Sequence, residues 1–224
     1  MNYDTINEIA ATSGGIIYIM GLLLLVALTV IIERLFFLGR LLRQGDSIAA
    51  SVNAMTYLDR AKLETLRKAN DKYPQASLLG VVLKHPEIRD TDHLDSLLEE
   101  EVLRQVPKLD KSLWLLDTIV TLAPLLGLFG TIIGMFHTFS ALSGSDPATG
   151  QVSGGIAEAL VATAAGLLIA IVGLVFFNGL NNRVRLVIHQ LETIKRMLLN
   201  RLPSAQPLGT DVRSSRMRSS VGEV

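Results

Sequence analysis

Residues 153–180 read SGGIAEALVATAAGLLIAIVGLVFFNGL, and this stretch decides the fold. Glu158 is its only ionisable side chain, and no Lys or Arg lies within it to neutralise the carboxylate. At about 1.5 Å per residue, a helix of this length crosses a hydrocarbon core of about 30 Å. An ionised carboxylate in hydrocarbon is costly, so Glu158 needs a proton, a partner group or a water-filled path. Each of these indicates ion or proton handling rather than simple anchorage.

Two further apolar runs can cross a membrane. Residues 16–32 carry no charge, and residues 118–142 have His137 as their only titratable group. The chain is 49% hydrophobic with a mean hydropathy of +0.40, which is too apolar for an ordinary soluble domain. None of the runs alternates with a period of two, so helices are predicted rather than the strands of a barrel. We therefore expect an all-α integral membrane protein with three transmembrane helices and long cytoplasmic helical extensions.

The basic residues predict the orientation of the chain. All 21 Lys and Arg residues lie in two segments, 34–112 and 181–224, which three crossings place on the same side of the membrane. Segments 1–14 and 143–153 contain acidic residues but no basic ones. Because cytoplasmic loops carry the excess of Lys and Arg, we expect a periplasmic N-terminus and a cytoplasmic C-terminus.

These signals divide the chain into eight expected segments. They are a periplasmic N-terminal segment (1–14), a first transmembrane helix (15–38), a cytoplasmic helical domain (39–112), a second transmembrane helix (113–142), a periplasmic loop (143–153), a third transmembrane helix (154–180), a cytoplasmic helix (181–202) and a disordered tail (203–224). The cytoplasmic helix should continue the third transmembrane helix, because an apolar stripe at helical spacing runs along it. The tail is rich in Ser, Arg, Gly and Pro, a composition typical of disorder.

The composition and motifs argue against most kinds of chemistry. The chain has no cysteine, which excludes disulfides and thiolate metal sites. A lone His137 is not a metal site, and we find no Ser/His/Asp set in the membrane, phosphate loop or dinucleotide fingerprint. We therefore expect no enzyme activity, no metal and no cofactor. The basic excess after residue 180 fits topology and the anionic headgroups of the bilayer, and nucleic acid is a poor alternative.

Small residues line one face of each of the last two predicted transmembrane helices. Lipid supplies no hydrophobic drive for helix association, so close contact between helices relies on such residues. The two faces should pack as an antiparallel hairpin. The expected packing residues are Gly127, Gly130 and Gly134 on the second helix, and Ala159, Ala162, Gly166, Ala170 and Gly173 on the third.

Three polar side chains accompany these faces. Thr131 can bond back to a carbonyl four residues earlier, or it can order water and assist a proton transfer. Glu158 lies about 100° to one side of Ala159, and Thr163 lies to the other side. The position of Glu158 suits a side chain that faces a central cavity or a second protein. Alternatively, Glu158 is hydrogen-bonded to a neighbouring helix. Asp117, at the start of the second helix, is expected to be interfacial, as a partner of the helix dipole.

Two sequence motifs resemble the ExbB/TolQ/MotA proton-channel family. They are GLFGT at residues 127–131, followed by Gly134, and GIAEALVATAAGL at residues 155–167. The similarity is specific over residues 117–178 and weaker elsewhere. MotA-type proteins have four membrane helices and fit badly, whereas the ExbB and TolQ branches fit in length and topology, with ExbB favoured.

The resemblance implies a motor subunit of the bacterial inner membrane. It implies a homopentamer around ExbD-like single-span chains that carry a membrane aspartate. Such a complex would use the proton motive force to energise a TonB-like protein and the outer-membrane import of iron chelates and cobalamin. By the same resemblance, Glu158, Thr131 and Thr163 line the proton route and face the partner's aspartate.

Three other interpretations remain open at this point. A TolQ-type subunit of the Tol-Pal system has the same motifs. A structural scaffold would use Glu158 only for packing, so Glu158→Ala would break assembly. An autonomous channel would conduct protons without partners. An intramembrane enzyme is disfavoured because the sequence shows no nucleophile–base or metal cluster.

Overall fold

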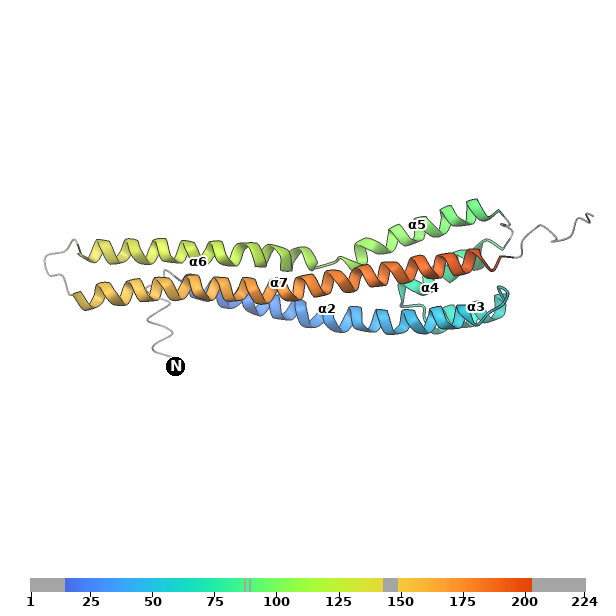
Figure 1. Ribbon diagram of the computed structural model, residues 1–224, viewed down its shortest axis with the longest axis horizontal. Helices are drawn as coiled ribbons and strands as arrows, with labels where there is room; N and C mark the ends of the chain where they lie inside the picture. Colours follow the sequence, from blue (N-terminus) through green and yellow to red (C-terminus); the bar gives the residue numbers. More distant parts are fainter. Residues whose placement is uncertain (1–14, 87, 89, 143–148, 203–224) are drawn as a thin grey trace, which may run out of the picture. The chain divides into compact units, whose positions relative to one another are not determined.

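The fold is all-α in the residues that the computed structural model describes, namely 15–86, 88, 90–142 and 149–202. The expected N-terminal segment, most of the expected loop and the expected tail lie outside these ranges. The helices, shown in Figure 1, are α2 (Ile16–Asn53), α3 (Arg60–Ala69), α4 (Pro74–Lys84), α5 (Thr91–Leu109), α6 (Leu113–Leu142) and α7 (Thr149–Leu199).

Three of these helices, α2, α6 and α7, are long and apolar enough to cross a membrane. They contain the three apolar runs that the sequence predicts as transmembrane helices. The exposed side chains of these runs are mostly large and apolar, as a surface in contact with lipid tails requires. Within the described residues, the prediction of an all-α protein with three membrane-spanning helices is confirmed.

Two helices are longer than the transmembrane segments expected from the sequence. Helix α2 continues to Asn53, past the expected end at Leu38, and α7 begins at Thr149, five positions before residue 154. The interior of α2 contains Gly39 and Gly45 but no proline, so nothing in its sequence forces it to end. Helix α7 is continuous through residues 181–199, as the apolar stripe predicts.

The chain forms two compact units, and each is described here by itself. Unit 1 contains residues up to Asp46 and residues Leu103–Gln190, and unit 2 contains residues Ser47–Val102 and those from Leu191 onward. The cytoplasmic domain expected over 39–112 therefore does not form a unit alone, because the last turns of α7 belong to unit 2.

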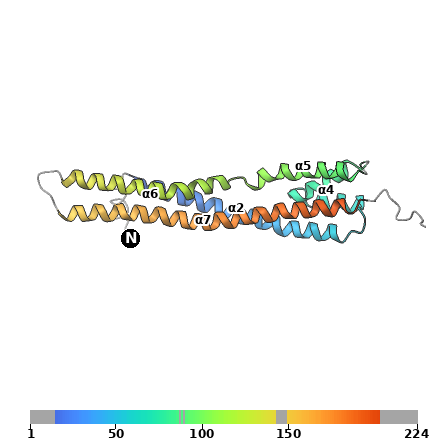
Figure 2. The same cartoon turned by 45° about the horizontal axis from the view of Figure 1, so that its top comes forward.

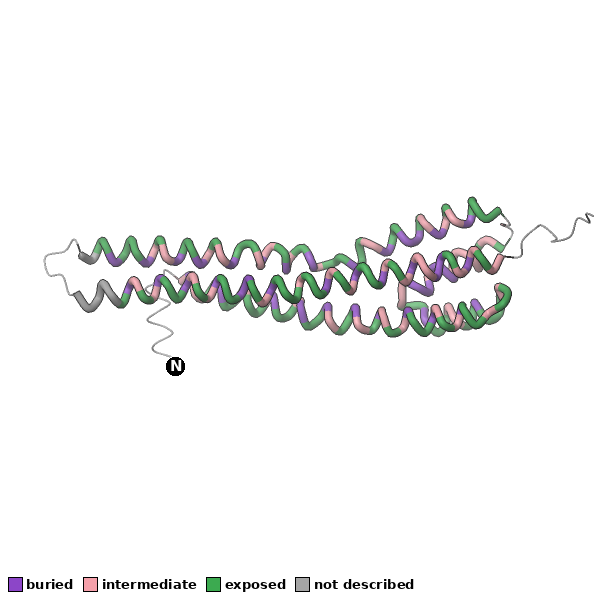
Figure 3. The backbone as a smooth tube through the Cα atoms, viewed as in Figure 1, coloured by how far each residue is buried: buried purple, intermediate pink, exposed green. Residues whose placement is uncertain are grey.

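Unit 1 is built on the antiparallel pair of α6 and the first part of α7. Figures 1 and 2 both show these two segments side by side. Figure 3 shows buried positions recurring along the side of α6 that faces α7. The N-terminal part of α2 adds to this pair, since Met20 and Ile16 reach glycines of α7 and α6, respectively.

Side chains of α7 also donate hydrogen bonds to carbonyls of α2 within unit 1. Arg183 Nη1 lies 3.1 Å from the Leu35 carbonyl oxygen. Gln190 Nε2 lies 3.1 Å from the Leu42 carbonyl oxygen and 2.7 Å from Asp46 Oδ1. Both backbone contacts join residues 148 positions apart, which indicates a constant register between two parallel helices. The Gln190 bonds support α2 beyond the expected end of the first transmembrane helix.

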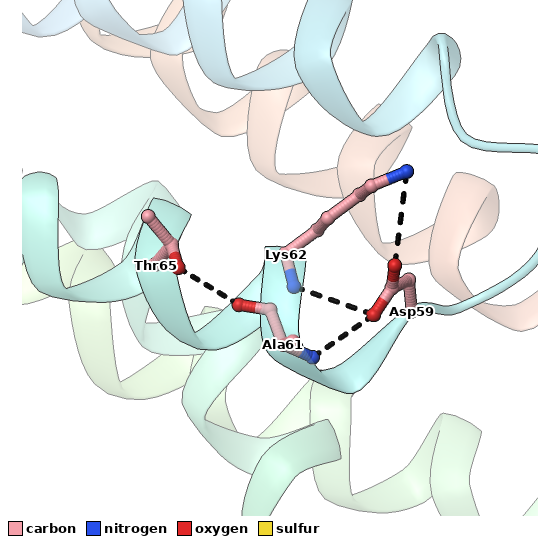
Figure 4. A network of polar contacts seen from close by, with 4 residues as sticks. All are labelled: Asp59, Ala61, Lys62 and Thr65. Carbon is pink, nitrogen blue, oxygen red and sulfur yellow. Dashed lines mark hydrogen bonds and ion pairs between the residues drawn. The ribbon is translucent and has the colours of Figure 1, made fainter.

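Unit 2 is a small helical core. Helix α3 begins at Asp59, whose Oδ1 accepts hydrogen bonds from the amides of Ala61 and Lys62 at 3.0 and 3.4 Å (Figure 4). Helix α4 begins at Pro74, a favoured residue for the first position because its missing N–H needs no partner there. The apolar side chains that fill the core are Leu63, Leu78, Leu79, Leu94, Leu98, Leu191, Ile194 and Leu198, all at most 1% exposed.

One cation is buried at the edge of this core. Lys195 of α7 is 8% exposed, and its Nζ lies 3.1 Å from Asp95 Oδ1 and also contacts Glu99 of α5. Burial lowers the pKa of Lys195, but its hydrogen bonds with Glu99 and Asp95 offset that effect, so the pKa is raised above its ordinary value of 10.5. Lys195 is therefore charged at neutral pH and ties α7 to α5.

Candidate functional site

The helix pair α6–α7 is held at very short distance by small residues. A Cβ placed on Gly134 would lie 2.9 Å from Ala159 Cβ, and one on Gly130 would lie 3.0 Å from Ala162 Cβ. A Cβ on Gly166 would collide with the backbone carbonyl oxygen of Ala123. The other small residues named from the sequence lie on the same seam, where Gly127 faces the backbone of residues 162 and 163, Gly173 faces Val120, and Ala170 is buried.

Close approach of the backbones permits a hydrogen bond between the two helices. Thr163 Oγ1 donates to the carbonyl oxygen of Gly127 at 2.9 Å. A side chain on Gly127 would fill the space through which α7 approaches, since its Cβ would lie 3.0 Å from Thr163 Cα. Thr163 therefore joins α7 to α6 at the centre of the seam, a contact that the sequence alone does not reveal.

The hydroxyl of Thr131 forms its hydrogen bond within its own helix. Its Oγ1 donates to the carbonyl oxygen of Leu128 at 2.6 Å, three residues earlier rather than four. Both threonines line one apolar groove of about 550 Å³ between α6 and α7. The remaining lining residues are Leu128, Ile132, Met135, Ile156, Ala159 and Leu160.

Glu158 stands apart from this groove. It does not line the groove, and a separation of five positions places it about 140° around α7 from Thr163. Its Oε2 atom has less than 1 Å² of accessible surface and no hydrogen-bond partner among the described residues. A buried carboxylate oxygen without a partner is costly, and more so next to hydrocarbon, so it indicates a proton, water or a group from another molecule.

An acid of α2 behaves differently. Glu33 Oε2 lies 3.1 Å from Arg34 Nε, and the Arg34 guanidinium also lies 5.2 Å from the ring centre of Phe37. Arg34 is 3% exposed and its Nη2 lies 3.4 Å from Ser112 Oγ. Glu33 thus has a cation beside it, unlike Glu158.

The described residues show no candidate metal site. His137 is exposed and contacts Phe136 edge-on, with ring centres 6.0 Å apart. Within the described ranges, no three His, Asp or Glu side chains come together in a way that could hold a metal ion. The arrangement can bind or pass a proton at Glu158, and it can pack a further helix against the groove.

The fold and this site define a class of protein: an integral membrane protein whose transmembrane hairpin carries an unpartnered acid. Residues 61–193 match the model of the MotA/TolQ/ExbB proton channel family. This match covers more than half of the chain, so the chain belongs to that family.

Individual relatives come from two branches of the family. An ExbB-like protein 1 of Synechocystis sp., named as a biopolymer transport protein, is 37% identical over 180 residues, covering 75% of this chain and 67% of the relative. A biopolymer transport protein ExbB of Neisseria gonorrhoeae is 36% identical over 96 residues, covering 42% of this chain and 44% of the relative. The Tol-Pal system protein TolQ of Haemophilus influenzae is 45% identical over 85 residues, covering 38% of this chain and 37% of the relative.

Proposed function

We propose that this chain is the proton-channel subunit of an inner-membrane motor of the ExbB type, with Glu158 as the group that binds the moving proton. The observation that carries the proposal is the buried Glu158 Oε2, which has no hydrogen-bond partner among the described residues. A proton or a partner group would relieve the cost of that oxygen. Membership of a proton-channel family supports the first choice.

The same unmatched charge indicates that a partner group is needed, and the family resemblance indicates which proteins would supply it. The apolar run 153–180 contains no Lys or Arg, so the group opposite Glu158 must come from elsewhere. We propose an ExbD-like single-span protein with a membrane aspartate, several copies of this chain around it, and a TonB-like protein that receives the work. Each proton that crosses a potential of 100 mV releases about 2.3 kcal/mol, which alternating protonation of Glu158 and the partner acid would convert into movement.

Thr131 and Thr163 have different proposed parts in this route. Thr131 lies on the groove surface, and its hydroxyl can rotate from the Leu128 carbonyl to a water molecule. Thr163 also lines the groove, but its hydroxyl is engaged by the Gly127 carbonyl of the other helix. We assign Thr131 to ordering water on the route, and Thr163 to holding the two helices in register beside it.

A second candidate function is the TolQ role in a Tol-Pal system. It is favoured by the 45% identity with the Haemophilus influenzae TolQ over 85 residues. This identity is higher than the 37% found with the Synechocystis ExbB-like protein, although the matched stretch is shorter. Both candidates use the same proton chemistry and differ in the partner that receives the work.

Complementation separates the two candidates and tests both. The gene, expressed with its single-span partner, is introduced into cells that lack their own ExbB and TolQ. Restored uptake of iron chelates supports the ExbB role, and restored resistance to detergent supports the TolQ role. Glu158→Gln should assemble normally and abolish whichever activity is restored. Retained activity in that variant would exclude proton binding at Glu158, and failed assembly of Glu158→Ala would support the scaffold interpretation.

A further inference from the structure

An acidic residue on the groove side of α6 has no role in the site described so far. Asp117 is exposed, and it forms no ion pair or side-chain hydrogen bond with the described residues. It lies beyond the first turn of α6, which contains no acidic residue, so the expected role as a partner of the helix dipole is not supported. An unpaired carboxylate at the edge of an apolar run is costly there unless it reaches water.

The face of α6 that carries Asp117 also forms the groove. At about 100° per residue, Leu128, Thr131 and Met135 all lie within about 40° of Asp117 around the helix. These three residues line the groove. Thr121 falls within the same range, and its hydroxyl bonds only to backbone carbonyls, at 2.9 and 3.2 Å. Three polar side chains, Thr131, Thr121 and Asp117, therefore share this face, with leucines between the two threonines.

The contacts between α6 and α7 give the depth of each group. Gly134 of α6 lies against Ala159, next to Glu158, whereas Val120, three residues from Asp117, lies against Gly173. In this antiparallel register Asp117 is level with residue 174 of α7. The distance from Glu158 along the helix axis is then about 24 Å, most of the thickness of a bilayer core. By this register, Glu158 and Asp117 stand near opposite ends of the same helix pair.

We propose that Asp117 is the exit group of the proton route, on the predicted cytoplasmic side of the membrane; this inference rests on the proposed function. Glu158 lies outside the groove, so a proton that leaves it must first enter the groove and then pass along water ordered by Thr131 and Thr121. It then protonates the Asp117 carboxylate, forming an O–H bond that breaks again when water on the inner side accepts the proton. The step needs no other reactant, and its driving force is the proton gradient.

The test measures proton flux in membrane vesicles from cells that express the full chain with its single-span partner. Asp117→Asn keeps the size of the side chain but cannot bind a proton, so the initial flux should fall by about tenfold or more. Asp117→Glu restores a titratable group and should recover at least half of the flux. Asp110→Asn, a change of another exposed aspartate in the turn before α6, is the matched control and should leave the flux unchanged. Each rate is divided by the amount of assembled complex on a native gel.

The outcomes separate this inference from the proposed function. If Glu158→Gln abolishes the flux while Asp117→Asn preserves it, the exit role is wrong and the proposed function stands. If Glu158→Gln preserves the flux, both are wrong. If Asp117→Asn fails to assemble, Asp117→Ser provides the second variant: it should assemble and lose flux, and an assembled Asp117→Ser that conducts normally would overturn the exit role. Lost flux that Asp117→Glu does not recover would indicate a structural role and would also overturn it.

Discussion

Two threonines at similar depth in the hairpin have different bonding, and this difference is visible only in three dimensions. Thr131 donates to its own helix, and Thr163 donates to the other helix. Interhelical hydrogen bonds in membrane proteins contribute about 0.6 kcal/mol on average and up to about 1.7 kcal/mol. Thr163 should therefore contribute to the stability of the α6–α7 pair, and Thr131 should not.

The first prediction compares these two threonines. Thr163→Val should lower the thermal stability of the purified protein, with a loss of about 1 kcal/mol in the free energy of unfolding. Thr131→Val should leave stability nearly unchanged, because the Leu128 carbonyl keeps its helical partner. Thr163→Ser, which retains the hydroxyl, is the control and should behave like the wild type. Equal stability of the two valine variants would refute the assignment of Thr163 to helix registration.

The second prediction concerns Lys195, which lies beyond the apolar run that ends at Leu180. Lys195→Met leaves Asp95 and Glu99 without their cation. The two carboxylates are 46% and 42% exposed, so water partly compensates them, and the loss should be about 1 kcal/mol. Lys195→Arg keeps the charge and should lose less. Denaturant unfolding of the purified protein measures both values, and a Lys195→Met variant as stable as the wild type would contradict the prediction.

The third prediction concerns how the stability of the protein changes at alkaline pH because of Lys195. The folded-state pKa of Lys195 is raised above 10.5, because the bonds to Glu99 and Asp95 outweigh the effect of burial. Its contribution to stability is therefore fully present below pH 10.5 and is lost as the pH rises through the folded-state pKa. Above that range the stability of the wild type should approach that of Lys195→Met, while Lys195→Arg keeps its contribution. A gap between wild type and Lys195→Met that stays constant through this range would contradict the assignment.

At the scale of the helix, α7 offers two glycines with opposite environments. A Cβ on Gly166 would collide with the Ala123 carbonyl, whereas nothing lies within 4 Å of a Cβ on Gly179. Gly166→Ala must therefore separate the two helices, and it should destabilise the protein by about 1–3 kcal/mol, as expected for overpacking. Gly179→Ala should be neutral or slightly stabilising, since alanine favours the helix.

Thermal unfolding in detergent, with proton flux as a second readout, tests this pair of substitutions. Gly166→Ala should lower both the unfolding temperature and the flux, because Thr163 and the groove depend on the seam. Tolerance of Gly166→Ala equal to that of Gly179→Ala would show that the α6–α7 contact is looser than the structure indicates.

The helices also show how far sequence reasoning reaches. The three apolar runs predict the three membrane-spanning helices, because length and hydropathy are properties of each segment alone. The end of α2 could not be predicted in this way. Arg183 and Gln190 donate hydrogen bonds to α2 from positions 148 residues away in the chain. Such contacts are not local properties of the sequence.

Part of the candidate site could also be predicted from the sequence, and part could not. The isolated acid Glu158 and the small residues are visible in the sequence, because an unmatched charge and a glycine ridge are patterns within one helix. The bond from Thr163 to Gly127 depends on two backbones meeting at one depth, which no single helix reveals. The sequence predicts Asp117 as an interfacial partner of the helix dipole, but α6 begins at Leu113, and that start places the carboxylate beyond the first turn.

At the scale of the whole molecule, one observation links the structure to the family. The chain belongs to the MotA/TolQ/ExbB proton channel family, and its apolar run 153–180 contains no Lys or Arg. Within that run, Glu158 Oε2 has no hydrogen-bond partner among the described residues. We infer that the partner is on another chain and that the proton motive force acts through Glu158. If this inference is correct, proton flow depends both on the Glu158 carboxylate and on the single-span partner.

The most direct measurement is proton flux into membrane vesicles that contain the full chain with its single-span partner, compared with vesicles that contain Glu158→Gln. Glu192→Gln, which changes an acid in the same helix beyond the apolar run, serves as the control. We predict normal assembly of all three complexes, loss of flux in Glu158→Gln alone, and no flux when the partner is omitted. Flux at the wild-type rate through an assembled Glu158→Gln complex would contradict this prediction.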